Sequence, residues 1–334
     1  MRHDCTRRKY DSPTYLTRSQ GALQRIGVAQ RRSLQPFHTT SLPRRRFFHG
    51  LGSRKEKRLR VKASDKDTPT ESTPDSTVLA DDSQAFERVV RSRYSSKHFS
   101  TKSIPEGMLQ KCLALASRGP TGFNVQPYVA IVVDSKDKKE AVSAAMLGPN
   151  AQRVLDAPAT IVFAADNNCD RLLPKVTQAL RDEGAPESYV SKVPLYVRLF
   201  SGGFGYFAGI PVIRMLLNLI GFLVRKVAFK IVSYFMPVPT PSTAETWSFK
   251  QSIFPATIFM LACTAFGLAT CPMEGYDTRR LRNALELPNN YSIPVAFAVG
   301  YPESEVKHRS SRFPPQELFF HNSFGTPYPG VPAV

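Results

Sequence analysis

Short apolar runs of strand length, separated by segments with helical periodicity, constrain this chain more than any other feature of its sequence. Three such runs are Tyr128–Val133 (YVAIVV), 160–164 (TIVFA) and 293–299 (IPVAFAV). Helices are predicted from Asp82 or Ser83 to Val90, from Pro105 to Gly119, and over 277–285. Strands that alternate with helices predict an α/β or α+β domain with helices packed on a central sheet.

Positive charge is concentrated at the N-terminus. Residues 1–64 contain 17 Lys and Arg but three acidic residues, whereas the other 270 residues contain 28 basic and 24 acidic ones. The nearly balanced body argues against a nucleic-acid partner, because such binding needs clustered cations. Residues 1–61 are rich in Arg and Ser, which predicts an organelle transit peptide, with a mitochondrion favoured over a plastid; a basic disordered tail is the alternative. Residues 62–77 are predicted to be a disordered linker, and 78–334 the folded domain.

Cysteine and histidine show no pattern of a metal centre or of a disulfide framework. The five cysteines include no CxxC pair, which suits free, mostly buried thiols in a reducing compartment. Beyond the N-terminal region, His98, His308 and His321 are isolated from one another in the sequence. We therefore predict no metal site.

Residues 251–273 require a choice between membrane and core. They form a charge-free stretch of 23 residues, which is long enough to span a bilayer. The stretch nevertheless contains Pro255, Gly267 and Pro272 among several small residues. We therefore predict a central buried helix here.

A second hydrophobic segment, 199–236, lies within a long insertion at about 170–246. Its residues Arg214, Asn218, Gly221 and Arg225 are spaced by three or four and share one helical face. This basic amphipathic pattern is compatible with peripheral membrane contact. The alternative is a helix that covers an active site or a partner subunit, and we prefer this alternative. In either case its aromatic side chains must cover another surface; they are Phe200, Phe204, Tyr206, Phe207, Phe222, Phe229, Tyr234 and Phe235.

Two separated motifs have the composition of a site for an anionic, planar cofactor. In 93–99 (RYSSKHF), alternate residues project to one side of an extended segment and can bind a phosphate; these are Arg93, Ser95 and Lys97. In 119–128 (GPTGFNVQPY), polar side chains can meet the edge of a heterocyclic ring; these are Thr121, Asn124 and Gln126. A solvated basic stretch and a simple turn are the respective alternatives.

A third motif, 271–276 (CPMEGY), follows the long apolar segment. Gly275 allows backbone to approach a flat ring closely, and Pro272 can pack against that ring. Glu274 is either a catalytic carboxylate or the source of a backbone N–H donor, and the sequence leaves both roles open. Downstream, 309–314 (RSSRFP) contributes further cations suited to a phosphate.

In this order, the motifs resemble the nitroreductase-like FMN oxidoreductase family over about residues 78–318. The resemblance implies a three-layer α+β fold, with a central, mostly antiparallel sheet flanked by helices. It also implies a homodimer in which a long central helix forms much of the contact. The FMN phosphate and ribityl chain are then bound by residues of the first and last motifs, namely Arg93, Tyr94, Ser95, Lys97 and Arg312.

The same resemblance assigns residues around the flavin ring. The loop that surrounds the ring, partly across the dimer interface, comprises Pro120, Thr121, Gly122, Asn124 and Gln126. The ring-contacting Asn and its nearby basic residue correspond to Asn150 and Arg153. The segment beside flavin N5 corresponds to Pro272, Met273, Glu274 and Gly275. Of these, Glu274 and Gly275 are the implied catalytic positions, with Glu274 acting mainly through its backbone amide.

The implied activity is that of an FMN-dependent oxidoreductase with a ping-pong mechanism. NADH or NADPH reduces the flavin and leaves, and a small electron-poor molecule then takes the electrons: a nitroaromatic, a quinone, an enone or a halogenated aromatic. The alternative is a membrane-associated flavin- or ligand-binding protein without reductase activity. The chain departs from the family pattern at Ser310, where many members have Lys, at Tyr128, where Trp is commoner, and in its hydrophobic insertion.

Overall fold

A computed structural model of the chain describes residues 76–201, 211–240, 242–303 and 310–333. The predicted transit peptide therefore lies outside the described residues, as does the predicted linker up to residue 75. The first described helix, α1 (Ser76–Ser92), begins two residues before the predicted domain boundary at Val78. The prediction that Asp82 or Ser83 caps this helix is wrong, because both residues lie inside it.

The described residues contain one four-stranded antiparallel sheet, in the order β1-β2-β4-β3. Its strands are β1 (Tyr128–Val133), β2 (Ala159–Asp166), β3 (Ala269–Met273) and β4 (Tyr291–Gly300). The three apolar runs identified in the sequence are β1, β2 and β4, which confirms those predictions. The antiparallel sheet flanked by helices also confirms the predicted α+β class.

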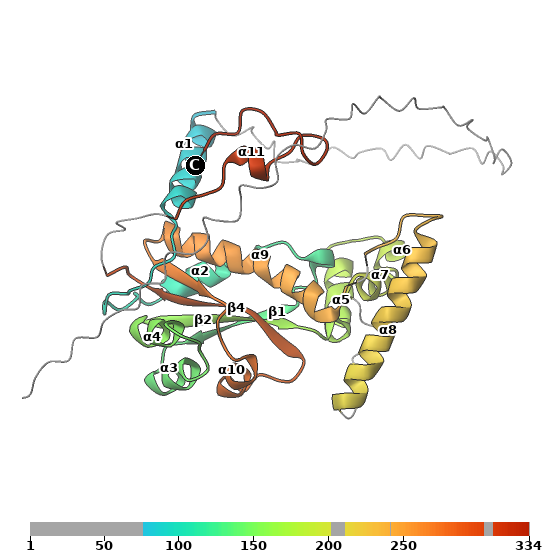
Figure 1. Cartoon of the computed structure of the whole chain (residues 1–334), viewed down its shortest axis with the longest axis horizontal. Coiled ribbons are helices and arrows are strands. Elements are labelled where there is room, and N and C mark those ends of the chain that lie inside the picture. The colour runs from blue at the N-terminus through green and yellow to red at the C-terminus, as the bar shows by residue number, and fades with distance from the viewer. Residues whose placement is uncertain (1–75, 202–210, 241, 304–309, 334) are drawn as a thin grey trace, which may run out of the picture. The chain divides into compact units, whose positions relative to one another are not determined.

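Helices cover both faces of the sheet and make the three layers visible in Figure 1. On one face lie α2 (Met108–Ala116) and α9 (Ala244–Ala265). There Phe163 of β2, Phe259 of α9 and Phe297 of β4 form a buried aromatic cluster with ring centroids 5.8–5.9 Å apart. Burial of these three large rings fixes the position of α9 across the sheet.

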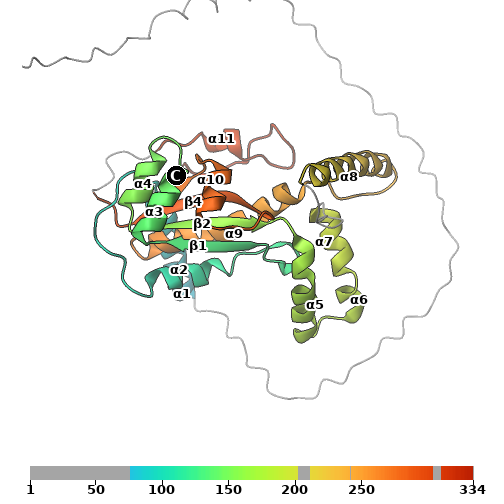
Figure 2. The same ribbon diagram turned by 90° about the horizontal axis from the view of Figure 1, so that it is seen from below.

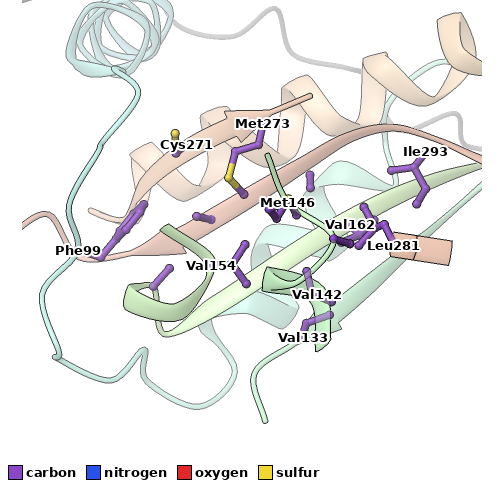
Figure 3. Packing of buried hydrophobic residues seen from close by; sticks show 14 of the residues in the cluster. Phe99, Val133, Val142, Met146, Val154, Val162, Cys271, Met273, Leu281 and Ile293 are labelled. Atoms are coloured by element: carbon purple, nitrogen blue, oxygen red, sulfur yellow. The ribbon is translucent and has the colours of Figure 1, made fainter. Parts of the chain in front are cut away.

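The opposite face carries α3 (Lys136–Ser143), α4 (Asn150–Asp156) and α10 (Thr278–Ala284). Their buried side chains pack against the alternate residues of the strands, as Figure 3 shows for Val142 and Leu281 near Val162, with Val154 farther along the sheet. Helix α10 confirms the helix predicted over 277–285. The side chain of Asp277 caps α10 by accepting a hydrogen bond from the backbone N–H of Arg280 at 3.0 Å.

The segment predicted as one buried helix, 251–273, is divided between α9 and β3. The interior of α9 is buried as expected, but the helix begins at Ala244 and ends at Ala265. Gly267, with φ of 77°, ends the helix, and the backbone N–H of Leu268 donates to the Cys263 carbonyl at 2.8 Å. The prediction of helix beyond residue 265 is therefore wrong.

The insertion forms a group of short helices and one long helix. After the 3-10 turn Cys169–Leu172 come α5 (Leu173–Asp182), α6 (Glu187–Val190), α7 (Val193–Ser201) and α8 (Pro211–Val232). Buried side chains of α5 and α7 pack with Trp247 at the start of α9 and with Val125. The loop that contains Val125 is thus held against the insertion. Near the C-terminus lies α11 (Pro315–Leu318).

Within the described part of the chain, no helix combines the length and hydropathy needed to cross a bilayer.

Candidate functional site

The first motif, 93–99, lies alongside the edge strand β3. Ser95 forms a parallel bridge with Thr270, and the backbone N–H of Ser96 donates to the Thr270 carbonyl at 3.0 Å. The chain bends at Lys97, so the motif is not the continuous extended segment that the sequence predicted. Lys97 Nζ still lies 3.9 Å from Cys271 Sγ. The polar residues of the motif are therefore gathered at β3.

Two cations that are distant in the sequence meet at this edge. Arg93 is half-buried, and its pKa is lowered first by burial and then by the positive charge of Arg312. Arg312 NH1 donates to the carbonyls of Ser310 and Ser311 at 3.2 and 3.0 Å. Beside Ser95, the hydroxyl Oγ1 of Thr270 is buried and has no hydrogen-bond partner. Neighbouring guanidinium groups together with a free hydroxyl donor suit an anion.

The third motif continues from β3 and contacts the start of α4. Asn150 Nδ2 donates to the Gly275 carbonyl at 3.1 Å, and Leu147 N donates to the same carbonyl at 2.9 Å. Arg153 donates to Asn150 Oδ1 and so orients the amide. A Cβ at position 275 would lie 2.9 Å from Asn150 Nδ2. Gly275 is therefore needed for close approach of the Asn150 side chain.

The side chains of the third motif point in different directions. Pro272 and Glu274 are exposed, whereas Met273 is buried in the core below the strand, as Figure 3 shows. The assignment of Met273 to cofactor binding is thus restricted to its backbone. Tyr276 is fixed by a 2.7 Å hydrogen bond from its hydroxyl to the Ile293 carbonyl. Burial, and then the charge of Glu274, raise the pKa of Tyr276.

The second motif forms a tight loop around the 3-10 turn η1 (Gly122–Asn124). Thr121 Oγ1 accepts a hydrogen bond from Gln126 N at 3.0 Å, and Gln126 Nε2 donates to Asn124 Oδ1 at 3.1 Å. Phe123, Asn124 and Gln126 all have positive φ, between 49° and 56°. Left-handed backbone at a bulky residue such as Phe123 costs free energy and persists where surrounding contacts impose it.

Those surrounding contacts come from residues that the sequence motifs did not identify. Gln251 of α9 accepts a 2.6 Å hydrogen bond from Gly122 N. The ring of Phe123 packs on Tyr196 and Phe200 of α7, with centroids 6.3 and 5.6 Å apart. Gln251 stands out in the sequence only as the first residue of the charge-free stretch, and the α7 aromatics only as part of a hydrophobic insertion.

A cavity of about 540 Å³ opens beside this loop. Apolar and aromatic side chains dominate its lining, together with a few polar groups; the lining includes Phe200, Ser242, Trp247, Lys250, Gln251 and Phe254. Gln251 lines the cavity and also holds Gly122, so the cavity and the loop share a wall. A cavity of this size and composition suits a small organic molecule.

The predicted site residues therefore form two groups. Arg93, Arg312, Asn150 and Gly275 are connected through β3 or the residues that follow it. The 120–126 loop leads into β1, and β1 and β3 are the two opposite edge strands of the sheet. A single chain thus places the loop at the far edge of the sheet from the residues at β3.

Known proteins resemble the chain in sequence and in fold. The chain is 26% identical to a protein named NADH dehydrogenase from Thermus thermophilus over 222 residues, which are 66% of this chain and 88% of that protein. Its fold matches a nitroreductase-like protein of Streptococcus mutans (TM-score 0.52, 18% identity, 71% of this chain and 97% of that one). It also matches a Staphylococcus epidermidis protein assigned as an NAD(P)H:FMN oxidoreductase (TM-score 0.50, 19% identity, 69% and 92%). The sequence model of the Nitroreductase family matches residues 90–301, so the chain belongs to that family.

Proposed function

We propose that this chain is an FMN-dependent oxidoreductase that moves electrons from NADH or NADPH to a small electron-poor acceptor. The observation that carries the proposal is the electrostatic interaction of Arg93 with Arg312, together with the buried, unpartnered hydroxyl of Thr270 on the strand that pairs with Ser95. This donor set fits a phosphate monoester such as that of FMN. The names of the Thermus and Staphylococcus relatives, NADH dehydrogenase and NAD(P)H:FMN oxidoreductase, support the same cofactor and co-substrate.

The chain's own residues bind the FMN and orient its ring. Arg93 and Arg312 neutralise the phosphate, and Lys97 adds a third cation at β3. Asn150, oriented by Arg153, fixes the backbone at Gly275, so that the segment 274–275 presents a rigid surface to the flavin ring. When bound, FMN supplies the hydride and electron transfer, which the protein tunes through position and charge.

The acceptor is proposed to enter through the cavity beside the 120–126 loop. Its walls include the aromatic rings of Phe200, Trp247 and Phe254, whereas Gln251 and Lys250 supply polar contacts. Such a lining favours a planar apolar molecule with few polar groups, such as a quinone or a nitroaromatic; enones and halogenated aromatics share these properties.

A homodimer is part of the proposal, because one chain holds its flavin-loop residues and its phosphate residues at opposite edges of the sheet. Large apolar side chains of α1 and of the C-terminal segment are exposed in the single chain, among them Phe86, Phe313, Phe319 and Phe324. Burial of this apolar surface against a second copy would stabilise the dimer. The loop of one protomer would then complete the site of the other.

The cofactor is tested on the purified protein. We expect a yellow protein whose extracted flavin is FMN and which oxidises NADH or NADPH when a quinone or nitroaromatic is added. A colourless protein that does not take up FMN, or a flavin-loaded protein inert toward both nicotinamides, would contradict the proposal.

The shared site is tested by co-expressing two defective chains. One carries Arg93→Ala and the other Gln126→Ala together with Asn124→Ala. If the loop acts across the dimer, the mixed dimer contains one intact site and regains the tight FMN binding that both parent homodimers have lost. If the loop acts within its own chain, both sites of the mixed dimer remain defective, and mixing restores nothing.

A further inference from the structure

Helix α8 carries an apolar stripe from Leu216 to Ile231 that faces solvent. Its side chains recur at intervals of three and four residues, as expected for one face of a helix. Each is between 48 and 62% exposed; they are Leu216, Leu219, Ile220, Leu223, Val224, Val227 and Ile231. Figures 1 and 2 both show α8 set apart from the sheet, at the end of the domain where α5 and α7 also lie. A continuous apolar surface of this kind marks an interaction site.

The orientation of α8 is the reverse of that of an ordinary surface helix, which turns its apolar side to the core. Among the α8 side chains that the structure describes, the half-buried ones are Phe222, Arg225 and Phe229, which are also spaced by three and four. Burial lowers the pKa of Arg225, whose Nε donates to the Gly221 carbonyl at 3.3 Å. A cation thus lies on the partly covered side, while the aliphatic stripe points outward.

The charged residues of α8 itself are all basic. Lys226 and Lys230 follow Leu223 and Val227 by three residues, so they lie beside the stripe, and both are exposed. Between residues 188 and 244 the sequence contains six Lys and Arg and no Asp or Glu. Like charges four residues apart on a helix repel each other, and an anionic surface removes that repulsion.

This charge pattern discriminates between two possible occupants. A second copy of the chain, meeting this face by twofold symmetry, would bring the two lysines and the same acid-free segment against themselves. An anionic bilayer complements the lysines and accepts the aliphatic stripe below its headgroups. Tyr234 and Phe235, 78 and 86% exposed just after the helix, suit the interfacial layer of a membrane.

We propose that the solvent-facing stripe of α8 docks flat on an anionic lipid bilayer, with Lys226 and Lys230 at its headgroups. The proposal is independent of flavin binding. Two helices of the insertion then have different roles. Helix α7 packs on the 120–126 loop, whereas α8 attaches the protein to a membrane surface.

The test needs a probe in α8 itself, because residues 1–64 carry a net charge of +14 and would bring every variant to anionic vesicles. Leu223→Trp in the full chain provides it, since the chain has one tryptophan, Trp247, which is 5% exposed. Vesicles are phosphatidylcholine, alone or with about one third phosphatidylserine. We expect the introduced tryptophan to shift its emission to the blue and to become protected from acrylamide with the anionic vesicles only.

The matched probe is Leu155→Trp on α4, at the opposite side of the domain, and it should stay accessible to acrylamide. Val227→Trp is a second probe within the stripe. In the Leu223→Trp chain, Lys226→Gln with Lys230→Gln should weaken insertion of the helix about thirtyfold, roughly fivefold for each lysine. Lys111→Gln with Lys136→Gln removes the same charge elsewhere and should leave insertion unchanged. Circular dichroism and flavin content confirm that each variant folds.

Three results would overturn the proposal. One is emission at both stripe positions that anionic vesicles do not change. Another is equal insertion into neutral and anionic vesicles with no effect of the two lysines. The last is a stripe tryptophan already blue-shifted and protected without lipid, because the stripe would then be covered by a second copy or by another protein segment.

Discussion

Replacing Arg93 by alanine separates two effects that the structure assigns to this side chain. The pKa of Arg93 is lowered by burial and by Arg312, so the folded state disfavours its charged form. At neutral pH the arginine is charged in both the folded and the unfolded protein. A charged base whose pKa is lowered on folding destabilises the folded state at that pH. We therefore expect Arg93→Ala to leave the free energy of unfolding of the flavin-free protein unchanged or slightly increased.

The effect on the flavin-bound protein has the opposite sign. A charge-assisted hydrogen bond to the phosphate contributes about 1.5–3 kcal/mol. Its loss weakens FMN affinity roughly ten- to a hundredfold. The stabilisation that saturating FMN gives to the folded state falls by a corresponding amount, since this stabilisation follows the logarithm of ligand concentration over Kd.

Titration of FMN fluorescence measures the affinity, and thermal unfolding with and without FMN measures both stabilities. Arg88→Ala, on the exposed surface of α1, is the matched control and should change neither. Unchanged FMN affinity in Arg93→Ala would remove Arg93 from the phosphate site. A strongly destabilised flavin-free variant would instead show that Arg93 holds the fold together, and the reasoning from its lowered pKa would be refuted.

Three further predictions concern the ring segment, the acceptor cavity and the N-terminal region. Gly275→Ala should weaken FMN binding about fivefold, because the new Cβ displaces Asn150 from its hydrogen bond. The control is Gly221→Ala, whose new Cβ meets no atom within 4 Å. Equal FMN affinities in the two variants would contradict the assignment of Gly275. Phe254→Ala should change the KM ratio between a bulky nitroaromatic and a small quinone while FMN affinity stays constant, since Phe254 lines the cavity; an unchanged ratio places the acceptor elsewhere. Removal of residues 1–75 should leave a soluble, flavin-loaded protein, because this part precedes the first helix of the described residues; loss of the thermal transition would show that residues 1–75 contribute to the core.

Elements with a distinct local pattern could be predicted from the sequence. The β-branched run of β1 was located to the residue, and the helical pattern over 277–285 located α10. The strand β3 was missed because it follows α9 in one charge-free stretch, and an apolar run by itself does not distinguish a buried helix from a buried strand. Gly267, which has a positive φ, separates α9 from β3, and its effect depends on the contacts around it.

The sequence by itself determined the family motifs and the residue types of the site, because spacing along the chain is enough to recognise both. Only the tertiary structure decided that Arg93 meets Arg312 and that Asn150 reaches Gly275, since these pairs are separated by more than a hundred residues and are joined by the sheet. It also decided which way α8 faces. Periodicity shows that a helix has an apolar side, but packing against the rest of the protein determines whether that side is covered or turned outward.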